Sequence, residues 1–294
     1  MINTNSLRPI VGEGKKIFIE TYGCQMNVGD SEIVVSIMQQ EGYFYTEEIT
    51  EADIILINTC SIRDNAEQRI WGRLTEMRRL RKQKPSLKIG IIGCMAERLK
   101  EQLLEGDLAV DIVAGPDAYR DLPRLVRDAE SGGKGVNVLL SQEETYAEIA
   151  PVRLDKNGVS AYVAIMRGCN NFCSYCIVPY VRGRERSRAP EEIIEEIKKQ
   201  VADGVIEVML LGQNVNSYGK NLDNPISFAE LLRRVEEIEG LQRIRFMTSH
   251  PKDLSDELIE VMKHSKKICR HLHLPLQSGS TRILKAMNRK YTKE

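Results

Sequence analysis

Three cysteines stand close together in the segment RGCNNFCSYCIVPYVRGRERSR, residues 167–188. Cys169, Cys173 and Cys176 have the spacing C-x3-C-x2-C. Cysteine thiolates bind zinc and iron–sulfur clusters, and a closed site of either kind normally takes four protein ligands. Three thiolates on a [4Fe–4S] cluster leave one iron without a protein ligand. That iron can bind a substrate or cofactor directly, so the spacing predicts a cluster that takes part in chemistry.

Three further cysteines each follow a segment typical of a buried parallel strand. The segments are residues 16–21, 52–58 and 88–92, and the cysteines are Cys24, Cys60 and Cys94. Carboxyl ends of parallel strands share one edge of a sheet, where open α/β sheets bind ligands. The sequence therefore predicts a second ligand site, with packing of buried thiols as the alternative. Gly23 and Gly93 beside them favour close backbone approach.

The elements between these cysteines alternate between strand and helix patterns. Helices are predicted at residues 28–41, 64–84, 99–104 and 121–130, and a further strand at 110–113. This alternation predicts an α/β domain at residues 14–131, with an open parallel sheet covered by helices on both faces. Residues 132–158 are predicted to be a linker that contains one strand at 136–140.

A second α/β region is predicted at residues 159–294. Its strands are expected at residues 161–166, 207–211, 243–247 and 271–274, and its helices at 190–204, 228–239 and 254–264. Polar residues follow each strand, on the edge where barrel-type α/β enzymes build active sites. This pattern predicts a partial (β/α) barrel.

Composition limits the class of protein. The chain has 294 residues, with 42 acidic and 42 basic side chains, so it has no net positive charge that would attract nucleic acid to the molecule as a whole. No apolar run reaches the roughly 18–20 residues that span a membrane, and the first 16 residues lack the apolar core of a secretory signal. A cytoplasmic monomer is expected. Seven cysteines argue against a pure disulfide framework, and Cys269, outside both triads, is expected to be a packing residue.

The cysteine spacing after a first strand, together with Tyr175, resembles the radical S-adenosylmethionine (SAM) superfamily. Longer motifs narrow the resemblance to the radical SAM methylthiotransferase family, nearest to its tRNA-2-methylthio-N(6)-dimethylallyladenosine synthase (MiaB-type) branch. These motifs are TYGCQMN, NTCSIR, GCMAER, LLGQNVNSY, TSHP and HLPLQSGS, at residues 21–27, 58–63, 93–98, 210–218, 248–251 and 273–280.

The resemblance implies two [4Fe–4S] clusters and SAM as cofactors. Cys169, Cys173 and Cys176 would hold the radical-generating cluster, and Cys24, Cys60 and Cys94 the sulfur-donating one. The implied reaction adds a methylthio group to C2 of an isopentenyl (dimethylallyl) adenosine beside the tRNA anticodon. It uses methyl transfer from SAM to a cluster-bound sulfur and radical C–H activation. Implied partners are tRNA, a flavodoxin- or ferredoxin-like reductant, and a sulfur source or cluster-assembly protein.

Contacts to SAM are expected from the strand ends. The candidates are Gln213, Asn214, Ser249, Gln277, Ser278 and Arg182, with helix or turn capping as the alternative for each polar residue. Arg182, Arg184, Arg186 and Arg188 are expected to bind the SAM carboxylate or RNA phosphate, with a solvated surface as the alternative. The basic run MRRLRKQK at residues 77–84 is a weaker RNA candidate, since a solvated helix face explains it equally well.

Family members continue past residue 294, through two more β/α units and a small β-rich RNA-binding domain, so a fragment is expected. Alternatives to the main prediction are a sibling enzyme that modifies threonylcarbamoyl-adenosine or a ribosomal protein, an iron–sulfur electron carrier, and a zinc-binding RNA protein. The motifs after Cys24 and Cys60 favour the isopentenyl-adenosine branch.

Overall fold

A computed structural model describes residues 12–61, 64–105, 108–155 and 158–294. Part of the N-terminal segment, the end of the NTCSIR motif and two residues near the end of the predicted linker lie outside these residues. The chain divides into two compact units. Unit 1 comprises Met1–Ser141 and Ile149–Leu154, and unit 2 comprises Gln142–Glu148 and Asp155–Glu294.

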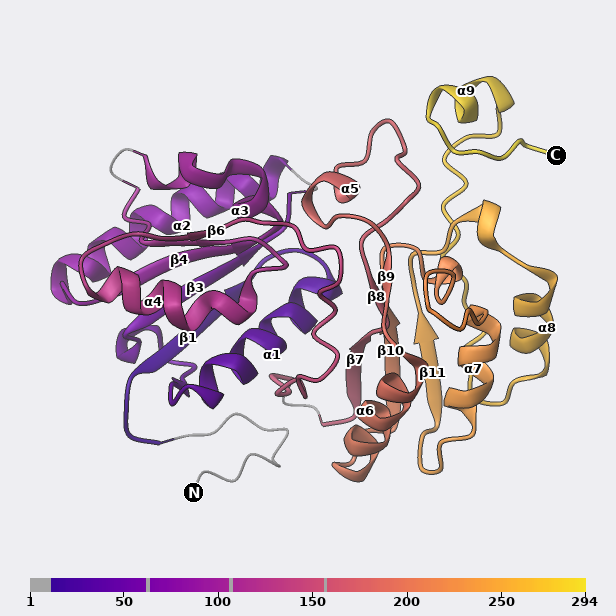
Figure 1. The fold of residues 1–294 in the computed structure, drawn as a ribbon, viewed down its shortest axis with the longest axis horizontal. Coiled ribbons are helices and arrows are strands. Elements are labelled where there is room, and N and C mark those ends of the chain that lie inside the picture. The colour runs from indigo at the N-terminus through magenta and orange to yellow at the C-terminus, as the bar shows by residue number, and fades with distance from the viewer. Residues whose placement is uncertain (1–11, 62–63, 106–107, 156–157) are drawn as a thin grey trace. The chain divides into compact units, whose positions relative to one another are not determined.

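Unit 1 contains a parallel sheet in the order β2-β1-β3-β4-β5-β6 (Figure 1). Its strands are β1 (Lys16–Thr21), β2 (Phe44–Tyr45), β3 (Ile54–Thr59), β4 (Lys88–Gly93), β5 (Ile112–Ala114) and β6 (Gly135–Asn137). Every residue of β3 is buried, as expected for a central strand that is covered on both faces. The predicted open parallel sheet is therefore confirmed. Strand β6 extends this sheet from within the segment that was predicted to be a linker.

Helices cover both faces of this sheet. Helices α1 (Gln25–Gln40) and α4 (Leu122–Glu130) lie on one face, and α2 (Asp64–Gln83) and α3 (Cys94–Leu99) on the other (Figure 1). The prediction of a helix at residues 99–104 was wrong. Helix α3 begins at Cys94 and ends at Leu99, because Lys100 takes a left-handed conformation (φ 51°) and a 3-10 turn, Lys100–Leu104, follows.

Unit 2 contains a parallel three-stranded sheet in the order β11-β10-β7 and an antiparallel pair, β8 with β9. Their bounds are β7 (Ser160–Ala164), β8 (Met166–Arg167), β9 (Arg186–Ser187), β10 (Glu207–Leu211) and β11 (Arg243–Phe246). The fourth strand predicted at residues 271–274 is not formed. A single parallel bridge joins Ile244 to Ile268, and beyond the end of β11 Ser249 N donates to His273 O at 3.3 Å.

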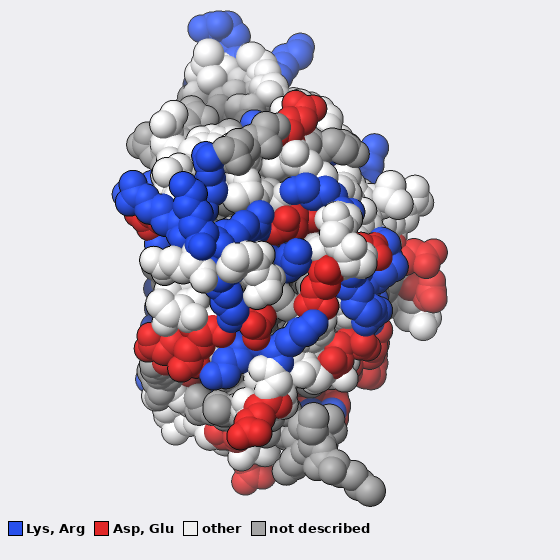
Figure 2. Space-filling model, turned by 90° about the vertical axis from the view of Figure 1, so that its left-hand side faces the viewer, with Lys and Arg blue, Asp and Glu red and all other residues white. Residues whose placement is uncertain are grey.

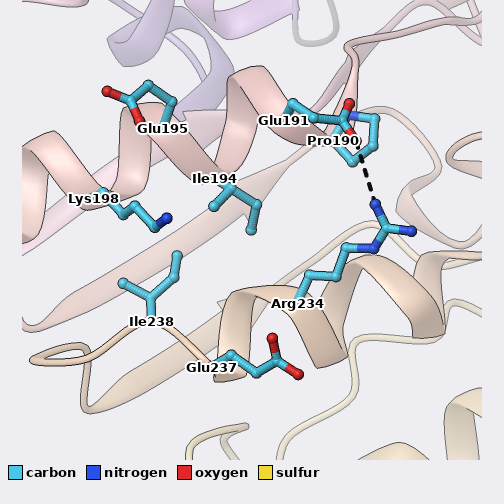
Figure 3. A pocket seen from close by; sticks show the side chains of 8 residues that line it. All are labelled: Pro190, Glu191, Ile194, Glu195, Lys198, Arg234, Glu237 and Ile238. Atoms are coloured by element: carbon cyan, nitrogen blue, oxygen red, sulfur yellow. Dashed lines mark hydrogen bonds and ion pairs between the residues drawn. The ribbon is translucent and has the colours of Figure 1, made fainter.

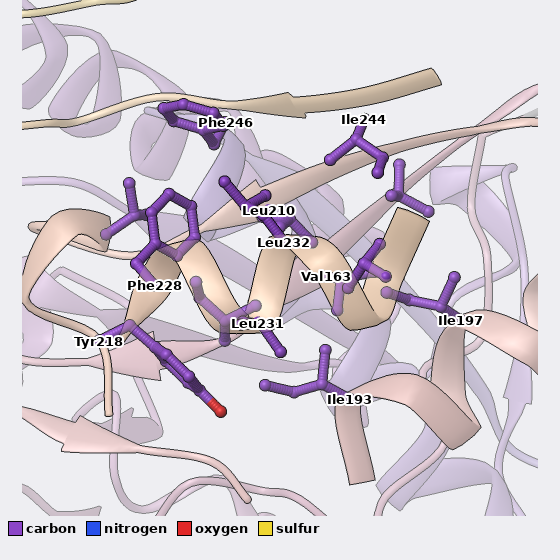
Figure 4. Close-up of a cluster of buried hydrophobic side chains, with 14 of the residues drawn as sticks. Val163, Ile193, Ile197, Leu210, Tyr218, Phe228, Leu231, Leu232, Ile244 and Phe246 are labelled. Atoms are coloured by element: carbon purple, nitrogen blue, oxygen red, sulfur yellow. The ribbon is translucent and has the colours of Figure 1, made fainter. Parts of the chain in front are cut away.

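Helices α6 (Pro190–Ala202), α7 (Phe228–Glu236) and α8 (Asp256–His264) pack on the sheet of unit 2, and α5 (Val178–Val181) and α9 (Thr281–Ala286) are short. The core lies between strands and helices (Figure 4). Leu231 and Leu232 of α7 contribute to it, and Phe228 meets Phe246 edge to face, with ring centroids 5.0 Å apart. This core fixes the positions of the strand ends. No described helix is long and apolar enough to cross a membrane.

Candidate iron–sulfur and cofactor sites

Cys24, Cys60 and Cys94 lie at one edge of the unit 1 sheet, here called the first cysteine edge. The register of the strands causes this placement, because Thr21 of β1 pairs with Asn58 of β3, and Thr59 pairs with Gly93 of β4. Each cysteine follows the end of its strand within three residues. Cys24 caps helix α1, and Cys94 is the first residue of α3.

The backbone is tightly packed at this edge. Gly23 has φ +134°, and a Cβ atom added there would lie 2.6 Å from Cys60 Cβ, which is too close for any side chain. Glycine at this position therefore lets the β1 and β3 ends approach each other, as its place beside Cys24 predicted.

A buried amide network supports the first cysteine edge from below. Asn58 donates from Nδ2 to Asn27 O at 2.8 Å and to Ser31 Oγ at 3.0 Å. Asn27 donates in return to Asn58 Oδ1 at 3.1 Å and to Thr59 O at 3.2 Å, and its Oδ1 lies 3.3 Å from Cys24 Sγ. Both asparagines are fully buried. The network thus fixes the loops that carry Cys24 and Cys60 relative to each other.

Glu97 lies one helical turn after Cys94 and is buried. Burial raises the pKa of its carboxyl to about 7. A Cβ added at Gly115 would lie 2.5 Å from Glu97 Oε2, so the carboxyl faces the chain that leaves β5. The Glu97 carboxyl is therefore a titratable group near the first cysteine edge, in addition to the three thiols.

The other triad lies in one short segment, residues 169–176, called the cysteine loop. The loop starts after Gly168 (φ +76°), where an added Cβ would lie 1.9 Å from Arg184 O. Cys169 N donates to Gly183 O at 3.1 Å, and Cys176 N donates to Cys173 O at 2.9 Å. The β8–β9 pair and the bond from Cys169 N to Gly183 O bring the two ends of the segment that contains the loop together.

Burial raises the pKa of the Cys169 thiol to about 11 and also raises the pKa of the Cys176 thiol. Thiolates are the form that binds metals, so loading this loop releases protons. Within the described residues, no three His, Cys, Asp or Glu side chains lie close enough to hold a single metal ion. A four-iron cluster is larger, and its thiolate ligands stand farther apart than those of one ion.

Polar side chains gather at the ends of β10 and β11. Gln213 Oε1, Asn214 Oδ1 and Ser249 Oγ are buried, and no hydrogen-bond partner is found for them among the described residues. Asn214 Nδ2 donates to Asp253 Oδ2 at 2.8 Å, and Val215 N donates to Thr248 O at 3.3 Å, which joins the two strand ends. Buried polar atoms are rarely left unpaired, so this edge suits a polar ligand such as SAM.

The remaining SAM candidates lie elsewhere in unit 2. Gln277 is exposed in a turn before α9, with φ +66°, and Ser278 Oγ accepts a bond from Ser280 N within that turn. Arg182 is buried at the end of α5, where its carbonyl oxygen accepts a bond from Arg186 Nη2 at 3.2 Å. Their roles toward SAM stay predictions.

The arginines after the cysteine loop do not form a surface patch. Arg182, Arg186 and Arg188 are each buried, and only Arg184 is exposed, 4.3 Å from the Phe172 ring centre. Arg188 is paired with Glu196 at 2.7 Å and also donates to Ala164 O at 2.9 Å. Arg188, directly after β9, therefore already has a buried carboxylate and a backbone carbonyl as partners, and the roles of these arginines toward SAM or RNA stay predictions.

The basic run at residues 77–84 forms the last turns of α2. Lys84 pairs with Asp53 at 2.7 Å, and Arg81 pairs with Asp111. Figure 2 shows one face of the molecule, on which basic and acidic side chains both occur in small groups. Two basic residues of this run are thus paired with acidic side chains.

Sequence reasoning missed the segment after α9. Ser174 N donates to Met287 O at 3.1 Å, Asn288 Nδ2 donates to Phe172 O at 2.7 Å, and Arg289 Nη1 donates to Cys173 Sγ at 3.4 Å. Tertiary packing alone brings these residues to the cysteine loop, and the sequence NRK at residues 288–290 contains no pattern that predicts this contact.

A groove of about 490 Å³ lies between α6 and the end of α7 (Figure 3). Glu191 and Arg234 face each other across it at 3.4 Å, and Ile194 and Ile238 line it. Neither a cysteine nor a SAM candidate lines this groove, so it is separate from the sites described above.

Two family models match the chain. Residues 16–115 match the uncharacterized protein family UPF0004, and residues 163–294 match the radical SAM superfamily. The first range contains Cys24, Cys60 and Cys94, and the second contains the cysteine loop and all the SAM candidates.

Curated relatives match nearly the whole chain. The chain is 56% identical over 284 residues to the tRNA-2-methylthio-N(6)-dimethylallyladenosine synthase of Bacteroides thetaiotaomicron, covering 96% of this chain and 62% of the relative. It is 57% identical over 281 residues to the protein of that name from Parabacteroides distasonis, covering 95% and 61%. The chain therefore spans about three-fifths of the length of these relatives.

Solved structures share the fold at low identity. The radical SAM methyltransferase TsrM from Kitasatospora setae matches with a TM-score of 0.66 at 12% identity, covering 95% of this chain and 63% of that one. The cobalamin-dependent radical SAM enzyme OxsB matches with a TM-score of 0.64 at 15% identity, covering 95% and 46%. These likenesses support the two-unit α/β architecture.

Proposed function

Because this chain belongs to the radical SAM methylthiotransferase family, we propose that it is part of a tRNA-modifying enzyme. The proposed enzyme converts isopentenyl (dimethylallyl) adenosine beside the anticodon to its 2-methylthio derivative. The observation that carries the proposal is the pair of cysteine triads, one in each unit, each at a site that the fold prepares.

Each triad has a distinct task in this proposal. Cys169, Cys173 and Cys176 bind a [4Fe–4S] cluster, while the burial of Cys169 and Cys173 limits the access of water. When bound, this cluster and SAM supply one-electron cleavage of SAM, which yields a radical able to remove hydrogen from an unactivated C–H bond. Gln213, Asn214 and Ser249 orient SAM through hydrogen bonds at the β10 and β11 ends.

The first cysteine edge holds the second cluster, which carries the sulfur. Cys24, Cys60 and Cys94 supply three thiolates, and the amide network of Asn27 and Asn58 keeps their loops in place. The substrate is a tRNA, and the reaction also needs a one-electron reductant and a sulfur source. We expect a cytoplasmic enzyme.

Nucleoside mass spectrometry tests the proposal directly. The gene that encodes this sequence is expressed in a bacterium that lacks its own methylthiolation enzyme, and its tRNA is digested. We expect 2-methylthio-isopentenyl-adenosine to appear, and the Cys173→Ala variant to leave isopentenyl-adenosine unmodified. Methylthiolated threonylcarbamoyl-adenosine instead would move the substrate to a sibling enzyme. A protein that holds both clusters but never cleaves SAM would contradict the proposal.

A further inference from the structure

Residues 287–291, here called the Arg289 strap, cross the cysteine loop after helix α9. Arg289 N donates to Leu284 O at 2.9 Å, and Leu284 is fully buried, which anchors the strap to α9. Asn288 and Lys290 both have positive φ, so the backbone turns sharply on either side of Arg289. These turns direct one side chain of the strap inward, and Arg289 is only 5% exposed.

The guanidinium of Arg289 is held at four points. Nη1 donates to Cys173 Sγ at 3.4 Å and to Tyr175 Oη at 3.3 Å, and Nη2 donates to Pro275 O at 2.9 Å. The group also lies 5.5 Å from the Tyr291 ring centre. Burial and fixed geometry make its charge more effective than a solvated arginine would be.

The strap also holds the loop itself. Asn288 Nδ2 bonds Phe172 O, and Met287 O accepts from Ser174 N, so the backbone on both sides of Cys173 is fixed. Arg289 also brings a positive charge to a sulfur of this loop, because Nη1 donates to Cys173 Sγ. A purely mechanical clamp would not need a cation aimed at a sulfur.

The potential of an iron–sulfur cluster depends on its net charge and on hydrogen bonds to its sulfurs. A reduced cluster carries one more negative charge than the oxidised one. A buried guanidinium that donates to a ligand sulfur therefore stabilises the reduced form more than the oxidised form.

We propose that Arg289 is a positioning residue that raises the reduction potential of the cluster on Cys169, Cys173 and Cys176 through its bond to Cys173. This inference rests on the proposed function, because it assumes that the loop holds that cluster. It adds a residue from outside the cysteine motif to the control of electron entry. The electron comes from the external reductant already required, and Arg289 neither gains nor loses a bond.

The test is a redox titration of the reconstituted protein without SAM, followed by electron paramagnetic resonance of the reduced cluster. A Cys60→Ala background removes the second cluster, so one signal reports on the loop. Arg289→Met removes charge and bond, Arg289→Lys keeps the charge on a different geometry, and Lys290→Gln removes an exposed charge from the same strap. Iron per chain is measured for each variant.

We expect Arg289→Met to shift the midpoint to more negative values, with the ratio of reduced to oxidised cluster at the parent midpoint falling by roughly tenfold or more. The midpoint potential of Arg289→Lys should lie between those of Arg289→Met and the parent protein, and that of Lys290→Gln should equal the parent value. Loss of iron with an unchanged midpoint in the remaining clusters would mean that the strap is only a clamp, and would overturn the inference.

If Arg289→Met holds no cluster, the midpoint potential of Arg289→Lys is the deciding measurement. A midpoint potential of Arg289→Lys equal to that of the parent protein would overturn the inference. If the parent itself holds no cluster on this loop, the proposed function fails instead, so the two failures are distinguishable.

Discussion

The two cysteine triads are assembled in opposite ways. At the first cysteine edge, the thiols come from three separate strand ends, and the sheet register brings them together. In the cysteine loop, the sequence places the thiols together, and a distant segment, the Arg289 strap, fixes their surroundings. The first site therefore depends on the folding of a whole sheet. The second depends on a local loop and on a few contacts that close it.

The largest expected effect separates the two sites. Cys173→Ala should remove SAM cleavage and the cluster of the loop, while unit 1 keeps its iron, because the two triads lie in different units. Cys60→Ala should remove the iron of unit 1 and still permit SAM cleavage. Iron analysis and anaerobic SAM cleavage measure both. If either variant loses all iron, the two sites are not independent.

The next largest effect concerns the buried ion pair of Arg188 and Glu196 in unit 2. Arg188→Met leaves Glu196 buried without its partner, since both side chains are under 10% exposed. Breaking such a pair should cost unit 2 about 3–5 kcal/mol of unfolding free energy. Urea denaturation followed by circular dichroism measures the loss. Trp71, the single tryptophan, lies in unit 1, so its fluorescence should show little change in the unfolding midpoint.

The two units should respond to pH in opposite directions. The pKa of Glu97 is raised to about 7 by burial, so unit 1 is most stable below the ordinary value of 4.5 and loses stability as pH rises toward 7. The pKa of His250 is lowered to about 4 by burial, so unit 2 is most stable above 6.5 and loses stability as pH falls toward 4.

Each contribution is at most ~3 kcal/mol. Hydrogen exchange of each unit at several pH values measures them in the metal-free protein. Glu97→Gln should flatten the dependence of unit 1 alone, and an unchanged slope would show that another group titrates there.

The smallest effect tests the amide network. Asn58→Ala removes two donated bonds and one accepted bond inside unit 1, and should cost about 2 kcal/mol. Because the network holds the loops of Cys24 and Cys60, iron uptake at the first cysteine edge should also slow. Thr75→Ala on the exposed side of α2 is the matched control. Equal iron uptake by both variants would show that the sheet alone positions these cysteines.

Most elements of unit 1 could be predicted from the sequence, because buried parallel strands are continuous apolar runs and β3 is such a run. The strand predicted at residues 271–274 fails for a physical reason. Its apolar and polar residues alternate, and His271 and His273 are exposed while Leu272 and Leu274 are half-buried. The segment nevertheless forms only a loop, because the backbone bonds to β11 are made earlier in the chain, where Ile244 N donates to Lys267 O and Cys269 N donates to Ile244 O.

The cysteine positions followed from spacing and from strand ends, both of which are local patterns. The surroundings of these thiols could not be predicted in the same way. Arg289 and Cys173 are 116 residues apart, and Asn27 of α1 is hydrogen-bonded to Asn58 of β3, 31 residues later. The burial of Arg188 was also missed, because a run of arginines is usually a solvated surface and β9 is too short to be recognised.

The separation of 116 residues between Cys173 and Arg289 has a consequence for protein synthesis. At ribosomal rates of 5–20 residues per second, Cys173 is made roughly 6–23 seconds before Arg289. For most of that interval the nascent loop has its thiols but lacks Arg289 and the rest of the strap that contacts it. A chain whose synthesis stalls during this interval exposes reactive thiols to oxidants and to other metal ions. The order of translation therefore determines when the loop can bind the proposed cluster in its final surroundings.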